Sequence, residues 1–165
     1  MAGCSPGGAA DGGSGDPSGS TISSSPRDSL ADIKPCDMLP PGTLKSFGLQ
    51  VPGELDNMLE WEPACDYQGD PINVNMIKNM RETVKSASEK DVWAEFERLQ
   101  VNGRSGARVI TKGATKARSC TVMFDAGKGT VQVQANEVRL PDDVDECQKA
   151  LEIARKVEPN VPEPA

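Results

Sequence analysis

Five positively charged side chains lie close together in the middle of this sequence, with no acidic residue between them. They are Arg104, Arg108, Lys112, Lys116 and Arg118. Positive charge at this density attracts phosphate groups or an acidic protein surface. Two interpretations are open: the region binds RNA or an acidic partner, or it is a solvated strand face balanced by the chain's own acidic residues.

The charge of the whole chain bears on the RNA interpretation. Residues 98–139 carry eight basic and two acidic residues, but the chain has a net charge of -7 and only 4% aromatic residues. A dedicated nucleic-acid domain is normally basic overall, and RNA-binding modules stack bases on aromatic side chains. RNA binding through residues 98–139 is therefore the alternative hypothesis, behind contact with another protein.

A second group of residues is suited to contact with a protein partner. Met58, Leu59 and Trp61 lie in residues 36–71, a segment punctuated by prolines, where Pro52 is suited to begin a short helix over residues 54–60. An exposed strip of these three side chains would anchor the segment in a partner's groove. The other interpretation is that residues 36–71 fold back onto the domain as an extra arm.

Catalytic and metal chemistry find little support in the residue types. The chain has no histidine, which excludes Ser–His, Cys–His and His–metal sites. The cysteines are odd in number and widely spaced, with no CxxC pair: Cys4, Cys36, Cys65, Cys120 and Cys147. We therefore expect reduced, structurally ordinary thiols, no metal site, no cofactor and no catalytic residue.

Two motifs that resemble ligand sites have simpler explanations. Residues 127–130 (Gly-Lys-Gly-Thr) fail the Walker A pattern, because Gly129 separates Lys128 from the threonine; a tight hairpin turn explains them. An acidic cluster lacks the glycine and distal glutamate of an EF-hand loop and suits a helix N-terminus instead. Its members are Asp142, Asp143, Asp145 and Glu146.

Residues 1–35 are rich in Gly, Ser, Asp and Pro and offer almost nothing to bury, so we expect a disordered tail. Ser5 and Ser25, each followed by proline, are either phosphorylation sites or ordinary serines of this tail. The start lacks the basic and apolar regions of a signal peptide, and no apolar run approaches the length that spans a bilayer. We expect a cytoplasmic or nuclear protein that does not contact membranes.

Hydrophobic periodicity is concentrated in residues 72–157. Apolar residues recur at helical spacing from Val74 to Ala87 and again from Val92 to Leu99. This predicts two helices or one kinked helix, and Asn102-Gly103 is a typical helix end. Alternating apolar and polar residues then predict strands over residues 107–112, 120–124 and 131–135, the last two forming a hairpin with its Gln/Asn face wet. An apolar stripe predicts a final helix over residues 142–157.

These elements predict an α+β fold. Their order is α-β-β-β-α, with helices packed on one face of a three-stranded antiparallel sheet, preceded by the disordered N-terminal tail. Residues 72–157 form the domain, residues 36–71 the arm or docking segment, and residues 158–165 a disordered C-terminal tail.

The predicted element order is similar to that of double-stranded-RNA-binding domains and of the Alu-domain subunits of the signal recognition particle. In the latter, a helix with Trp and Phe precedes a basic first strand, which residues 92–99 (VWAEFERL) followed by residues 107–110 (ARVI) resemble. The resemblance is one of topology, and a shared fold does not fix a function. We therefore assign no family from the sequence alone.

The residues taken together favour a non-enzymatic protein–protein interaction module, an adaptor or small subunit of an intracellular complex. We expect a protein partner, bound through Met58, Leu59 and Trp61, and a hetero-oligomer rather than a homo-oligomer. The alternative is an RNA-associated subunit of a ribonucleoprotein that uses the basic region.

Overall fold

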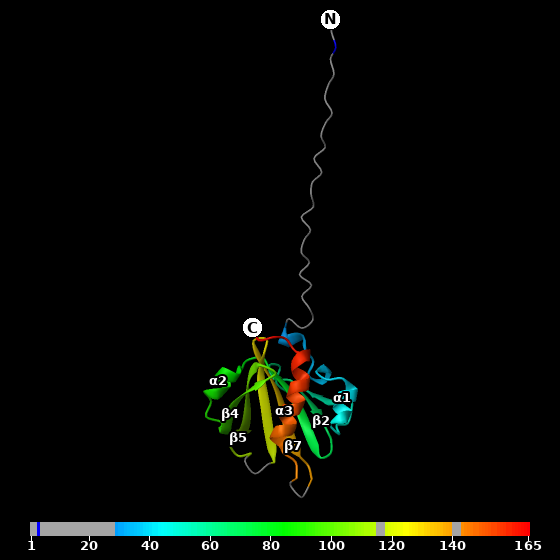
Figure 1. The fold of residues 1–165 in the computed structure, drawn as a ribbon, viewed down its shortest axis with the longest axis vertical. Helices are drawn as coiled ribbons and strands as arrows, with labels where there is room; N and C mark the ends of the chain where they lie inside the picture. Colours follow the sequence, from blue (N-terminus) through cyan, green and yellow to red (C-terminus); the bar gives the residue numbers. More distant parts are fainter. Residues whose placement is uncertain (1–2, 4–28, 115–117, 140–142) are drawn as a thin grey trace.

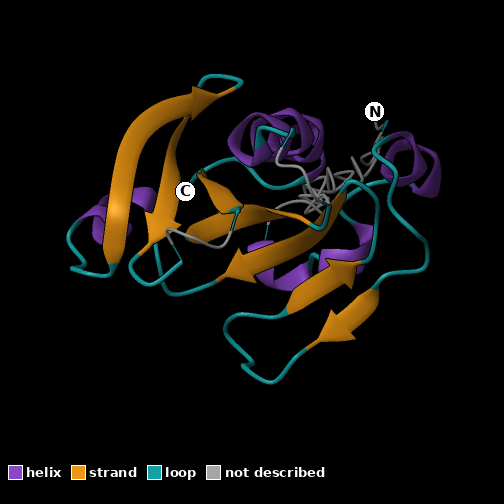
Figure 2. Ribbon diagram, turned by 90° about the horizontal axis from the view of Figure 1, so that it is seen from below, coloured by secondary structure: helices purple, strands orange, loops and turns teal. Residues whose placement is uncertain are grey.

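The computed structural model describes residue 3 and residues 29–114, 118–139 and 143–165. Within these residues the chain forms one antiparallel sheet in the order β1-β2-β3-β7-β6-β5-β4 (Figure 1). The strands are β1 (Glu54–Asp56), β2 (Ala64–Tyr67), β3 (Ile72–Asn79), β4 (Trp93–Val101), β5 (Arg104–Thr111), β6 (Ser119–Ala126) and β7 (Gly129–Glu137). The helices are η1 (Leu30–Asp32), η2 (Pro35–Asp37), α1 (Pro41–Ser46), α2 (Val84–Ser88), α3 (Glu146–Val157) and η3 (Glu158–Asn160). Figure 2 shows how strongly the sheet twists.

The predicted α-β-β-β-α order on a three-stranded sheet is wrong, because the first predicted helix is largely a strand. In β3, Val74 and Met76 are fully buried, while Asn73 and Asn75 on the opposite face are half-buried. The same residues therefore satisfy a two-residue period as well as a helical one. Pairing with β7 along the whole length of β3 decides between the two, and that pairing joins segments far apart in the chain. Only the short helix α2 remains of the predicted helix.

The second predicted helix, over residues 92–99, is also a strand. A β-bulge between Trp93 and Glu95 shifts the register of β4 by one residue, so Trp93 and Phe96 pack against the same hydrophobic cluster. The bulge thus creates in a strand the three-residue spacing that is typical of a helix. Asn102 and Gly103, with φ of 49° and 91°, form the β4–β5 hairpin turn rather than a helix end.

Other elements agree with the predictions. The β6–β7 hairpin is confirmed, with Val122 opposite Val133 and the turn at Gly127. The C-terminal helix is confirmed as α3, and the side chain of Asp145 caps it by accepting a hydrogen bond from the backbone N–H of Gln148 at 2.9 Å. With the four additional strands, the topological resemblance to RNA-binding domains no longer holds.

The two faces of the sheet differ in chemistry. One face carries the buried apolar residues of β2, β3, β6 and β7, and α3 packs on it through β6 and β7. The other we call the amide face, defined by the half-buried Asn73, Asn75, Gln132, Gln134 and Asn136. Helix α2 covers this second face only near β5 and β6, where it packs on the side chains of those strands.

Both ends of the described chain pack onto this domain. Leu30 and Leu44 are buried in the main core, so residues 29–53 belong to the same unit as the sheet. Residues 158–165, expected to be a disordered tail, form η3, bury Val161 and pair with Gly127 through Pro164. Most of the predicted tail over residues 1–35, with Ser5 and Ser25, lies outside the described residues.

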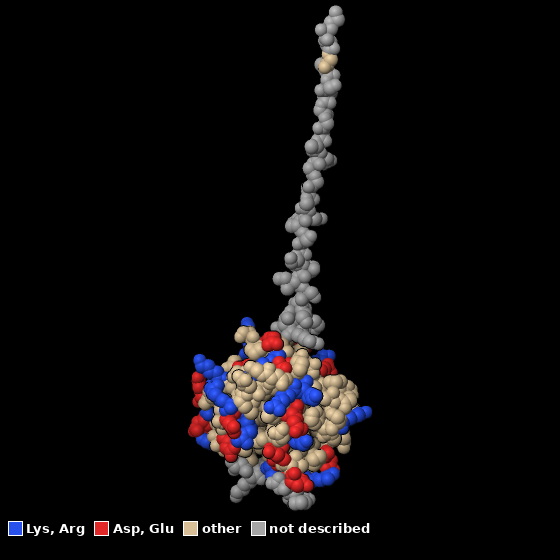
Figure 3. All heavy atoms as spheres, viewed as in Figure 1, with Lys and Arg blue, Asp and Glu red and all other residues tan. Residues whose placement is uncertain are grey.

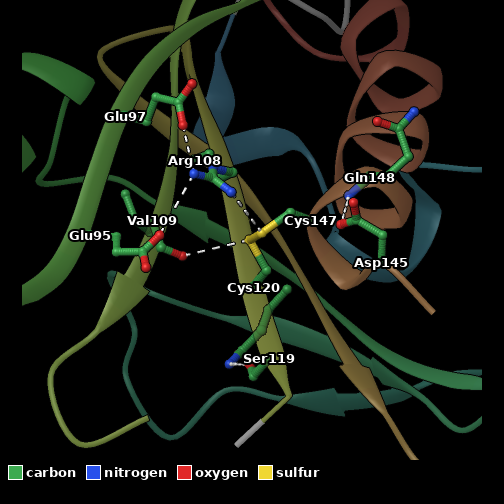
Figure 4. Close-up of a disulfide and its surroundings, with 10 residues drawn as sticks. Glu95, Glu97, Arg108, Val109, Ser119, Cys120, Asp145, Cys147 and Gln148 are labelled. Carbon is green, nitrogen blue, oxygen red and sulfur yellow. Dashed lines mark hydrogen bonds and ion pairs between the residues drawn. A yellow bond between two sulfur atoms is a disulfide. The ribbon is translucent and has the colours of Figure 1, made fainter. Parts of the chain in front are cut away.

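The expectation of reduced cysteines is wrong for four of the five. One disulfide, Cys36–Cys65, joins η2 to β2, and the other, Cys120–Cys147, joins β6 to α3 (Figure 4). The fifth, Cys4, lies outside the described residues. Each pair is separated by fewer than thirty residues, 29 and 27, yet the sheet topology brings them together. Among the described helices, none is long and apolar enough to cross a membrane.

Candidate partner-docking site

A hollow of about 440 Å³ opens between the amide face and the connection from β1 to β2. Its floor is formed by strands, and its lip by the connection, residues 57–63. The lining residues are Asp56, Met58, Leu59, Glu62, Ala64, Asp66, Asn75, Ile77 and Gln134. Two of the three predicted partner-binding residues, Met58 and Leu59, are therefore at this site.

Local hydrogen bonds hold the lip in place. The side chain of Asp56 accepts from the backbone N–H of Met58 at 3.0 Å, and the N–H of Glu62 donates to the carbonyl of Leu59 at 3.0 Å. The carbonyl of Trp61 then accepts from the N–H of Met80 at 2.9 Å, which ties the connection to the end of β3. These bonds make an ordered turn, which replaces the short helix predicted over residues 54–60.

The lip exposes apolar side chains to solvent. Met58 is 89% exposed and Leu59 46%, and Leu55 in the adjoining strand β1 is 54% exposed. Scattered single exposed apolar residues are ordinary, but a cluster in one short stretch marks an interaction surface. Trp61 differs from its predicted companions: it is half-buried, does not line the hollow, and stacks under the guanidinium of Arg81, 5.0 Å from the ring centre.

Carboxylates surround the lip without cations to pair them. Residues 54–70 contain six acidic residues and no lysine or arginine. Five of them have no ion-pair partner among the described residues: Glu54, Asp56, Glu60, Glu62 and Asp66. The edge of the sheet at β1 and β2 is therefore an uncompensated acidic surface beside exposed apolar groups.

Glu62 shows the effect of this crowding on protonation. Burial raises the pKa of the Glu62 carboxyl, and repulsion from Glu82 raises it further. A hydrogen bond donated by the Asn79 amide and the more distant charge of Lys90 oppose the shift without cancelling it. Glu62 therefore holds its proton to a higher pH than an ordinary glutamate.

A network of amides forms the floor of the hollow and continues along the sheet. The Asn136 Nδ2 donates to Asn75 Oδ1 at 3.0 Å, and Asn75 in turn donates to Asp66. Gln134 Nε2 donates to Ser119 Oγ at 3.0 Å. The network orients these side chains and leaves the amide face half-buried rather than covered, in agreement with the prediction of a wet Gln/Asn face.

Arg104, the first of the five clustered basic residues, is not on the surface. Its side chain is 6% exposed and its Nε donates to Glu158 Oε1 at 2.6 Å. Its other nitrogens donate to the carbonyls of Pro162 at 2.5 Å and Val161 at 3.2 Å. The guanidinium therefore holds the C-terminal segment against β5, which is a structural role.

Three more of the five basic residues singled out above, Arg108, Lys112 and Arg118, are paired with carboxylates. Arg108 contacts Glu97 at 2.6 Å and Glu95 at 3.6 Å, beside the Cys120–Cys147 disulfide (Figure 4). Lys112 pairs with Asp91.

Arg118 pairs with the buried carboxylate of Glu137 at 3.3 Å. Lys116 lies outside the described residues. Basic and acidic side chains alternate over the molecular face in Figure 3, so no single-sign patch is seen there.

A larger hollow, of about 610 Å³, lies beside the Cys36–Cys65 disulfide. Its walls include the core residues Met38, Leu44 and Tyr67, and the hydroxyl of Tyr67 already donates to the carbonyl of Cys36 at 3.1 Å. Burial raises the pKa of this tyrosine, and nearby Asp37 adds to the shift. With its hydroxyl engaged and only Asp37 charged among the lining residues, this hollow offers fewer groups to a partner than the first.

A comparison with protein-family models matches residues 1–160, which is nearly the whole chain. The chain belongs to the family described as protein of unknown function (DUF3558). No curated protein and no solved structure matches it. The description of the DUF3558 family names no activity or partner.

Sequence reasoning about this DUF3558 chain anticipated the apolar lip and missed its acidic surroundings. The signal was present, since no lysine or arginine occurs between Lys45 and Lys78. The sequence does not show which charged side chains form ion pairs in the folded chain. This pairing decides which charged region is available to a partner. Among the described residues, no three metal-ligating side chains come together.

Proposed function

We propose that this protein is a non-enzymatic protein–protein interaction module that docks its partner at the β1–β2 connection. The observation that carries the proposal is the exposure of Met58 and Leu59 at a hollow with a polar floor, with Leu55 also exposed in the adjoining strand β1. An apolar centre with a polar surround is the usual anatomy of a protein interface.

The energetics support docking at this lip. Fully burying one such apolar side chain contributes about 1.5–3 kcal/mol, so two or three of them supply a meaningful part of a micromolar complex, which needs about 8 kcal/mol in total. Ordering costs are small, because the turn is already held by hydrogen bonds to Asp56 and Met80. The site is acidic and not self-complementary, so we propose a different protein as the partner, in a hetero-oligomer.

We further propose that the protein works in an oxidising compartment, in place of the cytoplasm or nucleus expected from the sequence. The two disulfides support this, because such bonds persist outside the reducing cytosol. Blocking free thiols with a maleimide in intact cells that make the protein tests it. Labelling of a single cysteine is expected, whereas labelling of all five would overturn the proposal.

Quantitative affinity capture from the same cells tests the docking function. Three baits are compared: the wild type, a lip variant and a matched variant with two exposed valines replaced elsewhere. The lip variant is Met58→Ser with Leu59→Ser, and the control is Val92→Ser with Val138→Ser. We expect a discrete protein that the lip variant loses at least about tenfold, which corresponds to about 1.4 kcal/mol, and that the control retains. Equal retention by both variants would contradict docking at the lip.

A further inference from the structure

We propose that the partner's docking segment is an extended strand of alternating basic and apolar residues, which adds to the open edge of β1. This inference rests on the proposed docking function and specifies what the site recognises. Three independent features of the site lead to it: a free strand edge, the distribution of charge over the two sides of that edge, and the apolar lip.

The free edge provides backbone hydrogen bonds. β1 lies at one end of the sheet and pairs only with β2 among the described strands. All three residues of β1 are exposed, and no described strand pairs with its outer edge. An unpaired edge is a template for an added strand, a common mode of peptide recognition.

The two sides of β1 would contact different kinds of side chain on an added strand. Glu54 and Asp56 stand opposite Asp66 and Ala64, which line the hollow side of the sheet, whereas Leu55 stands opposite Cys65 on the other side. In an antiparallel pair, directly opposite residues share a face and interact. A strand added to β1 therefore meets carboxylates with every second side chain and Leu55 with the one between.

The lip suits the stems of basic side chains. Met58 and Leu59 border the same hollow as Asp56 and Asp66. Lysine and arginine bury their methylene stems on apolar surface and keep the charged end near carboxylates. The unpaired charges of the site thus select a cationic occupant, and the alternation along β1 selects an extended one.

The test uses end-blocked, dye-labelled synthetic peptides and the full chain, with binding followed by fluorescence anisotropy at low salt. The first peptide alternates lysine and leucine, the second has glutamate for each lysine, and the third has the composition of the first with lysines and leucines in two blocks. We expect the alternating basic peptide to bind at least about tenfold more tightly than either control, with an affinity that falls as salt is added.

Two charge variants locate the contact. Neutralising the site with Glu54→Gln, Asp56→Asn and Asp66→Asn is expected to weaken binding of the alternating peptide at least about tenfold. The matched control removes three carboxylates elsewhere, all exposed, through Asp32→Asn, Glu89→Gln and Asp143→Asn, and is expected to change affinity less than about twofold.

The outcomes separate this inference from the docking function. Equal binding of the blocked-sequence peptide would overturn strand addition, and equal binding of the glutamate peptide would overturn selection by charge. If no peptide binds while affinity capture still finds a partner lost on replacing Met58 and Leu59, the inference fails and the docking function stands. Self-association through the acidic edge would show a second copy as occupant and also overturn the inference.

Discussion

Two charged regions lie at opposite parts of the sheet and differ in how their charge is used. The basic residues around β5 are numerous, but each described one the sequence singled out contacts a carboxylate, and Arg104 is buried. Residues 54–70, around β1 and β2, contain six acidic residues, and five of them have no ion-pair partner among the described residues. Charge density along a sequence and open charge on a surface are therefore separate properties.

This difference in ion pairing indicates which of the two regions is expected to bind a partner. Forming an ion pair within the chain leaves little net potential for a ligand, and breaking that pair adds a cost to binding. An unpaired carboxylate beside an exposed methionine has no such cost. The basic residues around β5 therefore stabilise the fold. The five acidic residues around β1 and β2 that have no ion-pair partner among the described residues form the candidate site.

The largest effect is expected from replacing Arg104. Arg104→Met leaves the Glu158 carboxylate and two carbonyls without their buried donor, and we expect a loss of about 3–5 kcal/mol in the free energy of unfolding. Urea unfolding followed by circular dichroism measures it. The control Lys112→Met breaks an exposed pair with Asp91 and should cost at most about 1 kcal/mol. A loss for Arg104→Met as small as the one expected for Lys112→Met would contradict the structural role of Arg104.

The disulfides come next, because one lies in each region. Cys36→Ser with Cys65→Ser, or Cys120→Ser with Cys147→Ser, should each lower the free energy of unfolding by about 2–4 kcal/mol. Chemical denaturation of the two variants beside the wild type under oxidising conditions measures this. Reduction should destabilise the wild type more than it destabilises either variant, because each variant keeps only one disulfide. Unchanged stability in both variants would contradict the account.

A smaller effect concerns pH and the acidic region. The raised pKa of Glu62 means that the folded chain keeps a proton that the unfolded chain has already lost, so stability falls as pH rises from the ordinary value of 4.5 through the raised pKa. Glu62→Gln removes this dependence, and the variant should gain stability relative to the wild type across that window. Thermal unfolding at a series of pH values measures the difference. A wild-type curve parallel to that of Glu62→Gln would contradict the assigned shift.

The smallest effect is expected on RNA association. Arg108→Ala with Lys112→Ala removes two charges that are already paired, so binding of a labelled single-stranded RNA should be weak and unchanged by the substitutions. A filter-binding assay over a salt series checks this. An affinity that falls steeply with salt in the wild type and is lost in the variant would revive the alternative of RNA binding through residues 98–139.

Some of the fold is predictable from the sequence because its signals are local. In the β6–β7 hairpin, strict alternation and a glycine turn define both strands, and the acidic start and apolar stripe define α3. The strand β3 is not predictable in this way, since Val74, Ile77 and Met80 fit a helix until β7 pairs with it. In β4 a bulge produces the misleading spacing.

The candidate site was predictable only in part, for a related reason. Apolar residues in a proline-rich segment predicted an exposed strip, and Met58 and Leu59 are exposed as expected. Trp61 lies in the same segment, but its ring stacks against Arg81. The disulfides depend on the approach of residues distant in sequence, and pairing cannot be deduced from spacing alone. Ion pairing around Arg108 likewise depends on the β4–β5 register.

Site-specific photocrosslinking tests the contrast between the two regions most directly. A benzophenone amino acid is placed at Met58 in one sample and at Lys112 in another, both exposed positions, in the full chain within the cells that make it. The account predicts a discrete protein adduct from position 58 and none of comparable yield from position 112. An adduct from position 112 alone, or from neither, would contradict docking at the β1–β2 connection.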